Sequence, residues 1–292
     1  MYLPTRQTGR LLAFNLISMS AVPSAQMGFL KSLSFRVYNL GVLSFYDVWV
    51  LWISCSYAWR APVETTLLPF FRAHFSQNHL DIGVGTGFFP AAVLAEKQPD
   101  HHQLTLWDLS TTALRKAKAR VEAVAPNVHV WTIEADATAF PAGIDTTQKY
   151  DSISASFLLH CIPMPTSQKI GGLVSTAQQL LSPTGVFYGA TVLGNTARKA
   201  TTPSGTIDWI TDGEAPLGIR AQRESATGLN IFGRMLMWAY NLAGIFSNWG
   251  DEPDVIVEAL EKGFRIIDSW IIGRVLFFRA QGPRPLGADA SK

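Results

Sequence analysis

The sequence predicts an α/β fold with one open, mostly parallel sheet, a helical cover before it and an insertion after its fifth strand. Short apolar segments alternate with helical patterns from residue 79 onward, which is typical of a parallel sheet with crossover helices. An apolar, aromatic-rich stretch precedes this alternation, and the segment 195–250 interrupts it without a simple period.

The pattern places the elements in chain order. We expect strands at 79–84, 103–108, 128–134, 150–156 and 185–192, with helices between them at 87–97, 111–124 and 166–182. The turn 183–185 should close the last of these helices. Further helices are expected near 230–245 and at 253–262, followed by strands at 264–271 and 274–280. Ligands of open α/β sheets bind at the carboxyl ends of the strands, which the cover and the insertion should therefore enclose.

The chain divides into segments of different character. Residues 1–26 are interpreted as a leader or flexible extension, and 27–75 as the N-terminal helical cover. Residues 76–281 are expected to form the α/β domain, within which 195–250 is a substrate cap, and 282–292 are expected to form a flexible tail. The run 11–22 is similar to a signal peptide, although Asn15 interrupts it. We expect a cytoplasmic protein.

Composition excludes several classes of protein. Of the 292 residues, 48% are hydrophobic and 16% are charged, and a net charge of +2 is too small for disorder or a nucleic-acid footprint. Two cysteines, Cys55 and Cys161, exclude a disulfide scaffold, and no His, Cys, Asp and Glu cluster has the spacing of a metal site. The stretch 37–57 carries one formal charge, Asp47, so membrane contact stays open, but its polar residues favour a buried helix over a site.

A glycine-rich loop follows the first expected strand. Gly83, Gly85 and Gly87 permit a tight turn and a close approach of a ligand to the backbone. The dinucleotide motif has its third glycine three positions after the second, where this chain has Phe88. Asp81, directly before the loop, suits a ligand that carries an amine or another cation.

Two further acids stand at the carboxyl ends of the next strands. Asp108 ends the second strand, where a carboxylate can accept hydrogen bonds from two ribose hydroxyls. Asp136 follows the third strand, where an adenine amino group would lie. Together with the loop, they predict a nucleoside-containing ligand.

These motifs resemble class I S-adenosylmethionine-dependent methyltransferases. The resemblance rests on the glycine motif 81–87, on 107–110 with the helix after it, on 150–160 and on the turn 181–187. It implies a Rossmann-like sheet, with the closing strands 264–271 and 274–280 supplying the antiparallel strand at its end. It also implies S-adenosyl-L-methionine as the cofactor.

The resemblance assigns cofactor roles residue by residue. Gly83, Gly85 and Gly87 would pass under the methionine and ribose, with Asp81 beside them. The ribose and adenine would be bound by Asp108, Leu109, Asp136 and Ala137. Phe157 would lie near the methionine end, and Tyr46 of the cover would close over the cofactor.

Methyl transfer from a sulfonium depends mostly on positioning, and a general base helps a weakly acidic acceptor. His160, directly after the fourth strand, and Asp47 are the candidate catalytic groups, although a structural role is open for both. Trp59, Trp238 and Asn241 are candidate substrate contacts, with core packing as the alternative for Trp59.

The aromatic cover and cap favour a large apolar or aromatic small-molecule acceptor. The segments 43–47 and 57–62 resemble fungal secondary-metabolite methyltransferases, which implies O-methylation of a polyketide-type compound. Carbon or nitrogen methylation stays open, as does a cyclase-like enzyme that binds the cofactor without transferring its methyl group. The sequence does not set the oligomeric state.

Overall fold

The computed structural model describes residues 47–97, 102–141, 143–194 and 229–286. The predicted leader, Tyr46 and the cover before it, and residues 195–228 of the insertion lie outside the described residues. None of the described helices is both long enough and apolar enough to cross a membrane.

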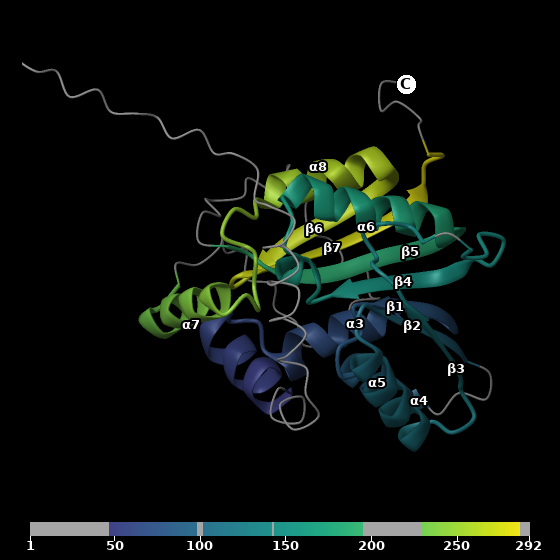
Figure 1. The fold of residues 1–292 in the computed structure, drawn as a ribbon, viewed down its shortest axis with the longest axis horizontal. Helices are drawn as coiled ribbons and strands as arrows, with labels where there is room; N and C mark the ends of the chain where they lie inside the picture. The colour runs from purple at the N-terminus through teal and green to yellow at the C-terminus, as the bar shows by residue number, and fades with distance from the viewer. Residues whose placement is uncertain (1–46, 98–101, 142, 195–228, 287–292) are drawn as a thin grey trace, which may run out of the picture.

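The described strands form one seven-stranded sheet in the order β3-β2-β1-β4-β5-β7-β6 (Figure 1). Their bounds are β1 (Asn78–Ile82), β2 (Gln103–Asp108), β3 (His129–Glu134), β4 (Tyr150–Ser156), β5 (Leu181–Val192), β6 (Phe264–Ile272) and β7 (Val275–Pro283). Strands β1 to β5 pair in parallel, whereas β7 is antiparallel to both of its neighbours, β5 and β6. The predicted Rossmann-like sheet with one antiparallel strand is confirmed, and that strand is second from the edge.

The described helices are, in chain order, η1 (Asp47–Ala58), η2 (Val63–Leu67), α3 (Leu68–His74), α4 (Phe88–Lys97), α5 (Thr111–Val124), η3 (Leu159–Cys161), α6 (Thr166–Leu180), α7 (Ile231–Leu242) and α8 (Pro253–Gly263). The first two are π-helices, and η3 is a 3-10 turn. Helices α6 and α8 lie on one side of the sheet, and α3, α4 and α5 lie on the other (Figure 1).

Strand alternation produces a core on each side of the sheet. Adjacent β5 residues divide between the two cores, since Tyr188 packs with the α3 side and Phe187 with the α6 side. Phe277 and Phe278 of β7 divide in the same way. This period of two is the expected pattern for a sheet covered on both faces.

The predicted boundaries of α6, β5 and β1 differ from the structure. Helix α6 ends at Leu180, and β5 begins at once at Leu181, so the predicted turn 183–185 lies inside the strand. Leu181 pairs with Tyr150, and an irregularity in the β4–β5 register accommodates the extra residues. Strand β1 ends at Ile82 because Gly83 adopts a φ of +73° and leaves the extended conformation.

The strand order places a switch point between β1 and β4. From β1 the chain winds outward through β2 to β3 and then returns to β4 on the other side. Ligands of open α/β sheets bind at such a point, beside the carboxyl ends of the strands. The glycine loop after β1, Asp108 at the end of β2 and Phe157 after β4 all lie at this edge.

Candidate active site

The glycine loop combines two tightly packed glycines with one open glycine. A Cβ at Gly83 would lie 2.7 Å from Leu158 Cδ1, and one at Gly87 would lie 2.7 Å from the Cα of Ala117 in α5. A Cβ at Gly85 would meet nothing within 4 Å, although its φ is +55°. Gly87 is therefore required by packing between the loop and α5, whereas Gly85 leaves open space where a ligand can approach the backbone.

Backbone donors hold the Asp108 carboxylate. Gly85 N–H donates to Oδ2 at 3.1 Å, and Ser110 N–H donates to Oδ1 at 2.9 Å. Burial raises the pKa of this carboxyl, and the backbone hydrogen bonds oppose the rise. Each carboxylate oxygen accepts more than one hydrogen bond, so both can still accept a ligand hydroxyl.

Asp81 is buried in β1 and ends a directed chain of hydrogen bonds. In its ionised form Asp81 can only accept, so Ser154 donates to Asp81 Oδ1 and must itself accept from His79 Nε2, 3.0 Å away. This assigns the His79 proton to Nε2, and Nδ1 therefore accepts from Ser152 Oγ at 2.6 Å. Burial lowers the pKa of His79 to about 3, which keeps the ring neutral. When Asp81 is ionised, every donor in this series of hydrogen bonds points toward its carboxylate.

The candidate adenine contacts lie after β2 and β3. Asp136 is exposed, and its Oδ1 accepts hydrogen bonds from the backbone N–H and the hydroxyl of Thr138, at 2.9 and 2.7 Å. Its Oδ2 has no hydrogen-bond partner among the described residues, so it is available to an amino group. The Leu109 side chain is 47% exposed directly after Asp108, whereas Ala137 is buried. Their roles stay predictions.

Phe157 and His160 form the turn after β4. Phe157 has a φ of +59°, a conformation that is uncommon for a bulky residue and concentrates at functional sites. His160 is buried, and its Nδ1 accepts from Val192 N–H at 3.2 Å, which assigns the ring proton to Nε2. Burial lowers its pKa to about 3. In this tautomer Nε2 is a hydrogen-bond donor. The ring is therefore better suited to orient an oxygen atom of a substrate than to remove a proton from that oxygen.

The cover contributes less to the described site. Asp47 is described only as the first residue of η1, so its catalytic role stays a prediction. Trp59 is fully buried and packs against Tyr240 and Phe246, with ring centroids 6.5 and 5.9 Å apart. Its side chain therefore lies in the core that joins the cover to α7, and its predicted substrate contact is untested.

A network of hydrogen bonds fixes the loop between α7 and α8. Asn241 donates to Asn248 Oδ1 at 3.0 Å, and Asn248 donates to Val192 O at the end of β5 at 2.9 Å. Ser247 N–H donates to His160 O at 2.7 Å. The amide of Asn241, a candidate substrate contact, is thus engaged in holding this loop at the carboxyl edge of the sheet.

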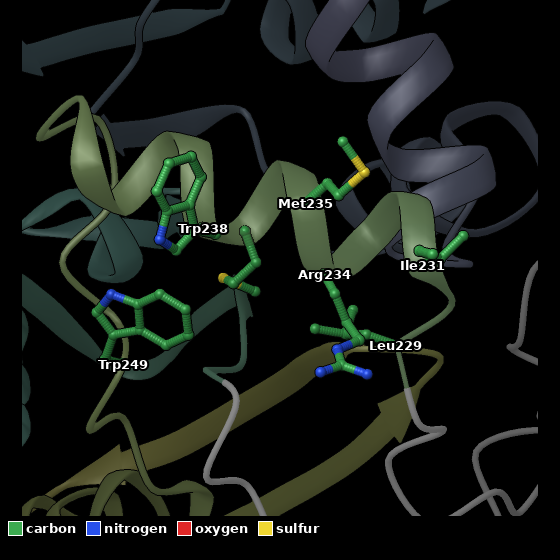
Figure 2. A pocket seen from close by; sticks show the side chains of 7 residues that line it. Leu229, Ile231, Arg234, Met235, Trp238 and Trp249 are labelled. Carbon is green, nitrogen blue, oxygen red and sulfur yellow. The ribbon is translucent and has the colours of Figure 1, made fainter.

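A pocket of about 500 Å³ lies along α7 (Figure 2). Four aliphatic or methionine side chains line it, together with the indoles of Trp238 and Trp249 and the guanidinium of Arg234. Trp238, a predicted substrate contact, is 59% exposed there. The pocket is open to solvent, and its volume lies within the range of small-molecule sites.

Comparison with known proteins identifies the family. Residues 80–187 match a family described as "Methyltransferase domain". O-methyltransferase NEC2 of Pyricularia oryzae is 34% identical over 279 residues, which cover 86% of this chain and 93% of that protein. The Physcion biosynthesis cluster O-methyltransferase of Aspergillus chevalieri is 36% identical over 248 residues, covering 85% of this chain and 94% of that protein. The chain is a methyltransferase.

A solved structure agrees with the fold of the methyltransferase. A possible exported protein from Bordetella parapertussis superposes with a TM-score of 0.51 at 16% identity, over 75% of this chain and 67% of that one. Within the described ranges, no group of three or more His, Cys, Asp or Glu side chains is arranged to hold a metal ion.

Several residues that support the methyltransferase site are absent from the sequence predictions. Arg120 of α5 donates to the carbonyl and the hydroxyl of Thr86, at 3.2 and 3.0 Å, and so clamps the glycine loop. His79 and Ser154 support Asp81. Polar residues that alternate with apolar ones in β1 and β4 were the sequence signal for the hydrogen bonds between His79, Ser154 and Asp81. Only the register of the two strands shows that these residues are neighbours.

Asp81 should make the stability of the methyltransferase depend on pH. Burial raises its pKa from 3.8 to about 7, so the folded protein binds more protons than the unfolded chain between these values. The contribution of Asp81 to stability is therefore greatest below about pH 4 and falls as the pH rises toward 7. In Asp81→Asn this fall should be smaller by roughly 3 kcal/mol between pH 4.5 and 7.5.

Urea unfolding at both pH values measures this difference. Asp151→Asn is the matched control, because it removes an exposed carboxylate from β4, and it should follow the wild type. Parallel pH profiles for Asp81→Asn and the wild type would contradict an ionisable, buried Asp81.

Proposed function

We propose that this methyltransferase uses S-adenosylmethionine to methylate a hydroxyl oxygen of an aromatic or apolar polyketide-type metabolite. Two kinds of observation support the proposal. The relatives named above are O-methyltransferases, and one belongs to the physcion biosynthesis cluster. The pocket along α7 is apolar and aromatic, which suits an acceptor of this kind.

The single observation that carries the cofactor proposal is the Asp108 carboxylate beside Gly85. Backbone donors orient both of its oxygens, and the space over Gly85 is open. Asp108 would accept the two ribose hydroxyls, Leu109 would cover one face of the adenine, and Asp136 Oδ2 would accept from its amino group. Asp81 would lie on the methionine side and balance the cationic part of the cofactor.

Bound S-adenosylmethionine would supply an electrophilic methyl group on a sulfonium. Transfer then requires an acceptor oxygen in line with that methyl group, at about 3 Å, and correct positioning supplies most of the acceleration. His160 would orient the acceptor through its Nε2–H. An acidic phenol or enol is largely ionised near neutral pH and needs no strong base, which is consistent with the neutral His160 ring.

Asp108→Asn should weaken the binding of S-adenosylmethionine by about 10- to 100-fold, because an amide replaces the charged acceptor of the ribose hydroxyls. Isothermal titration calorimetry measures this affinity, and circular dichroism checks that the variant is folded. Asp145→Asn is the control, because Asp145 is an exposed carboxylate that accepts hydrogen bonds from Thr147 within a turn. The absence of saturable binding by the folded wild type would overturn the cofactor proposal.

The products separate the remaining alternatives. Incubation with S-adenosylmethionine and aromatic polyketide phenols should release S-adenosylhomocysteine and place the methyl group on oxygen, as judged by mass spectrometry and NMR. A methyl group on carbon or nitrogen would exclude O-methylation. A converted acceptor without release of S-adenosylhomocysteine would indicate a cofactor-retaining cyclase instead.

A further inference from the structure

The pocket along α7 contains one charged group in otherwise apolar surroundings. Arg234 and Trp238 lie four residues apart and therefore share a face of α7, while Trp249 comes from the loop after that helix (Figure 2). The other lining side chains are aliphatic or methionine. An aromatic ring system packed on these indoles would bring its substituents near a guanidinium.

Within the described residues Arg234 forms no ion pair, in contrast to Arg72 and Arg279. Arg72 pairs with Glu96 at 2.5 Å, and Arg279 pairs with Asp268 at 2.6 Å. No ion pair or side-chain hydrogen bond involves Arg234 within the described part of the chain. Its five donors are therefore available to a ligand, and a guanidinium binds a carboxylate through two parallel hydrogen bonds.

The pocket also lies at the catalytic edge of the sheet. The side-chain amide of Asn248, directly before Trp249, donates a hydrogen bond to Val192 O at the end of β5. The backbone N–H of Ser247 donates to His160 O. At the other end of α7, Asn230 donates to Tyr57 O of the cover at 3.0 Å. The pocket wall is thus tied to the same strand ends as the turn that holds His160.

We propose that Arg234 selects acceptors that carry an anionic oxygen, either a carboxylate or an ionised phenol or enol, on an aromatic ring system. This inference rests on the proposed function and adds a specificity-determining residue to it. Trp238 and Trp249 supply aromatic surfaces on which different kinds of aromatic ring can pack. Arg234 supplies the charge preference, which the apolar walls do not.

Matched probes test the charge preference directly. Calorimetry compares 3-hydroxy-2-naphthoate with its methyl ester, and 4-hydroxy-6-methyl-2-pyrone at pH 8 with its O-methyl ether. The wild type should bind at least one anion about tenfold more tightly than its neutral counterpart, since a charge-assisted hydrogen bond is lost in the ester or ether. A preference within the naphthoate pair indicates recognition of a carboxylate, and a preference within the pyrone pair indicates recognition of an ionised enol.

Arg234→Gln should remove the preference without weakening the neutral probes, and Arg234→Lys should keep part of it. Arg265→Gln is the control, because Arg265 is exposed on β6 at the far edge of the sheet. Higher salt should reduce the preference in the wild type. Equal affinity for the members of both pairs, an unchanged preference in Arg234→Gln, or no binding of any probe would overturn the proposal.

The titrations are performed with and without S-adenosylhomocysteine, whose own affinity is measured first. Failure to bind S-adenosylhomocysteine would count against the proposed function. A wild type that binds it but treats anionic and neutral probes alike would count only against the role of Arg234.

Discussion

Replacing Lys169 by methionine should lower the free energy of unfolding by about 3–5 kcal/mol, because it leaves a buried carboxylate without its cation. Lys169 of α6 donates to Asp251 Oδ2 at 2.7 Å and to Ser247 O at 3.0 Å, and both side chains of the ion pair are almost completely buried. Burial raises the pKa of Asp251, and Lys169 opposes that rise. The destabilisation should therefore be smaller at pH 5 than at pH 8, as measured by urea unfolding.

Two further variants isolate the buried pair. Lys262→Met removes an ion pair of the same 2.7 Å length, to Glu258, but on an exposed surface, and it should change stability far less than Lys169→Met does. Lys169→Met combined with Asp251→Leu should recover much of the loss, because no unpaired charge remains. Equal effects of Lys169→Met and Lys262→Met would contradict the prediction.

The glycine loop should separate stability from ligand binding. Gly87→Ala should destabilise the protein by roughly 3 kcal/mol, because it combines a left-handed backbone with overlap on the α5 backbone. The φ of Gly87 is +70°, and the added Cβ would lie 2.7 Å from Ala117 Cα. Gly85→Ala meets no neighbour, so it should lose only about 1–2 kcal/mol through backbone strain.

For the affinity for S-adenosylmethionine, we expect the larger effect from Gly85→Ala and the smaller one from Gly87→Ala. Gly85→Ala places a methyl group in the open space over the loop and should abolish detectable binding of S-adenosylmethionine by a folded protein. Gly143→Ala is the control, because its φ of +90° and open surroundings reproduce the strain in the loop that leads into β4. Wild-type affinity in Gly85→Ala would show that the ligand does not approach the backbone there.

The predictable part of this protein depends on short sequence spans. Asp81 and the three glycines lie within seven residues, and Asp108 ends a strand whose apolar pattern is continuous. Local rules for strands, turns and parallel pairing were enough to bring these groups to one edge of the sheet. The antiparallel closing strand followed from the resemblance that these motifs carried.

The supporting contacts were beyond sequence reasoning, because they join distant residues of unremarkable type. Lys169 and Asp251 are 82 residues apart, and a lone lysine in an amphipathic helix predicts an exposed side chain. The chain from His79 to Asp81 depends on the β1–β4 register, which no local pattern fixes. A role for Arg234 could not be predicted, because the pocket that it lines is formed by α7 together with Trp249 of the following loop.

The position of β7 also limits when the protein can fold during synthesis. The last strand in the sequence lies between β5 and β6, and its Phe277 and Phe278 complete the cores on the two faces of the sheet. Before β7 is translated, β1 to β5 can form only a partial sheet, in which the edge of β5 that will pair with β7 is unpaired. Such an edge is a template for aggregation until it is covered. The cores on both faces therefore stay incomplete until β7 has been translated and pairs with β5.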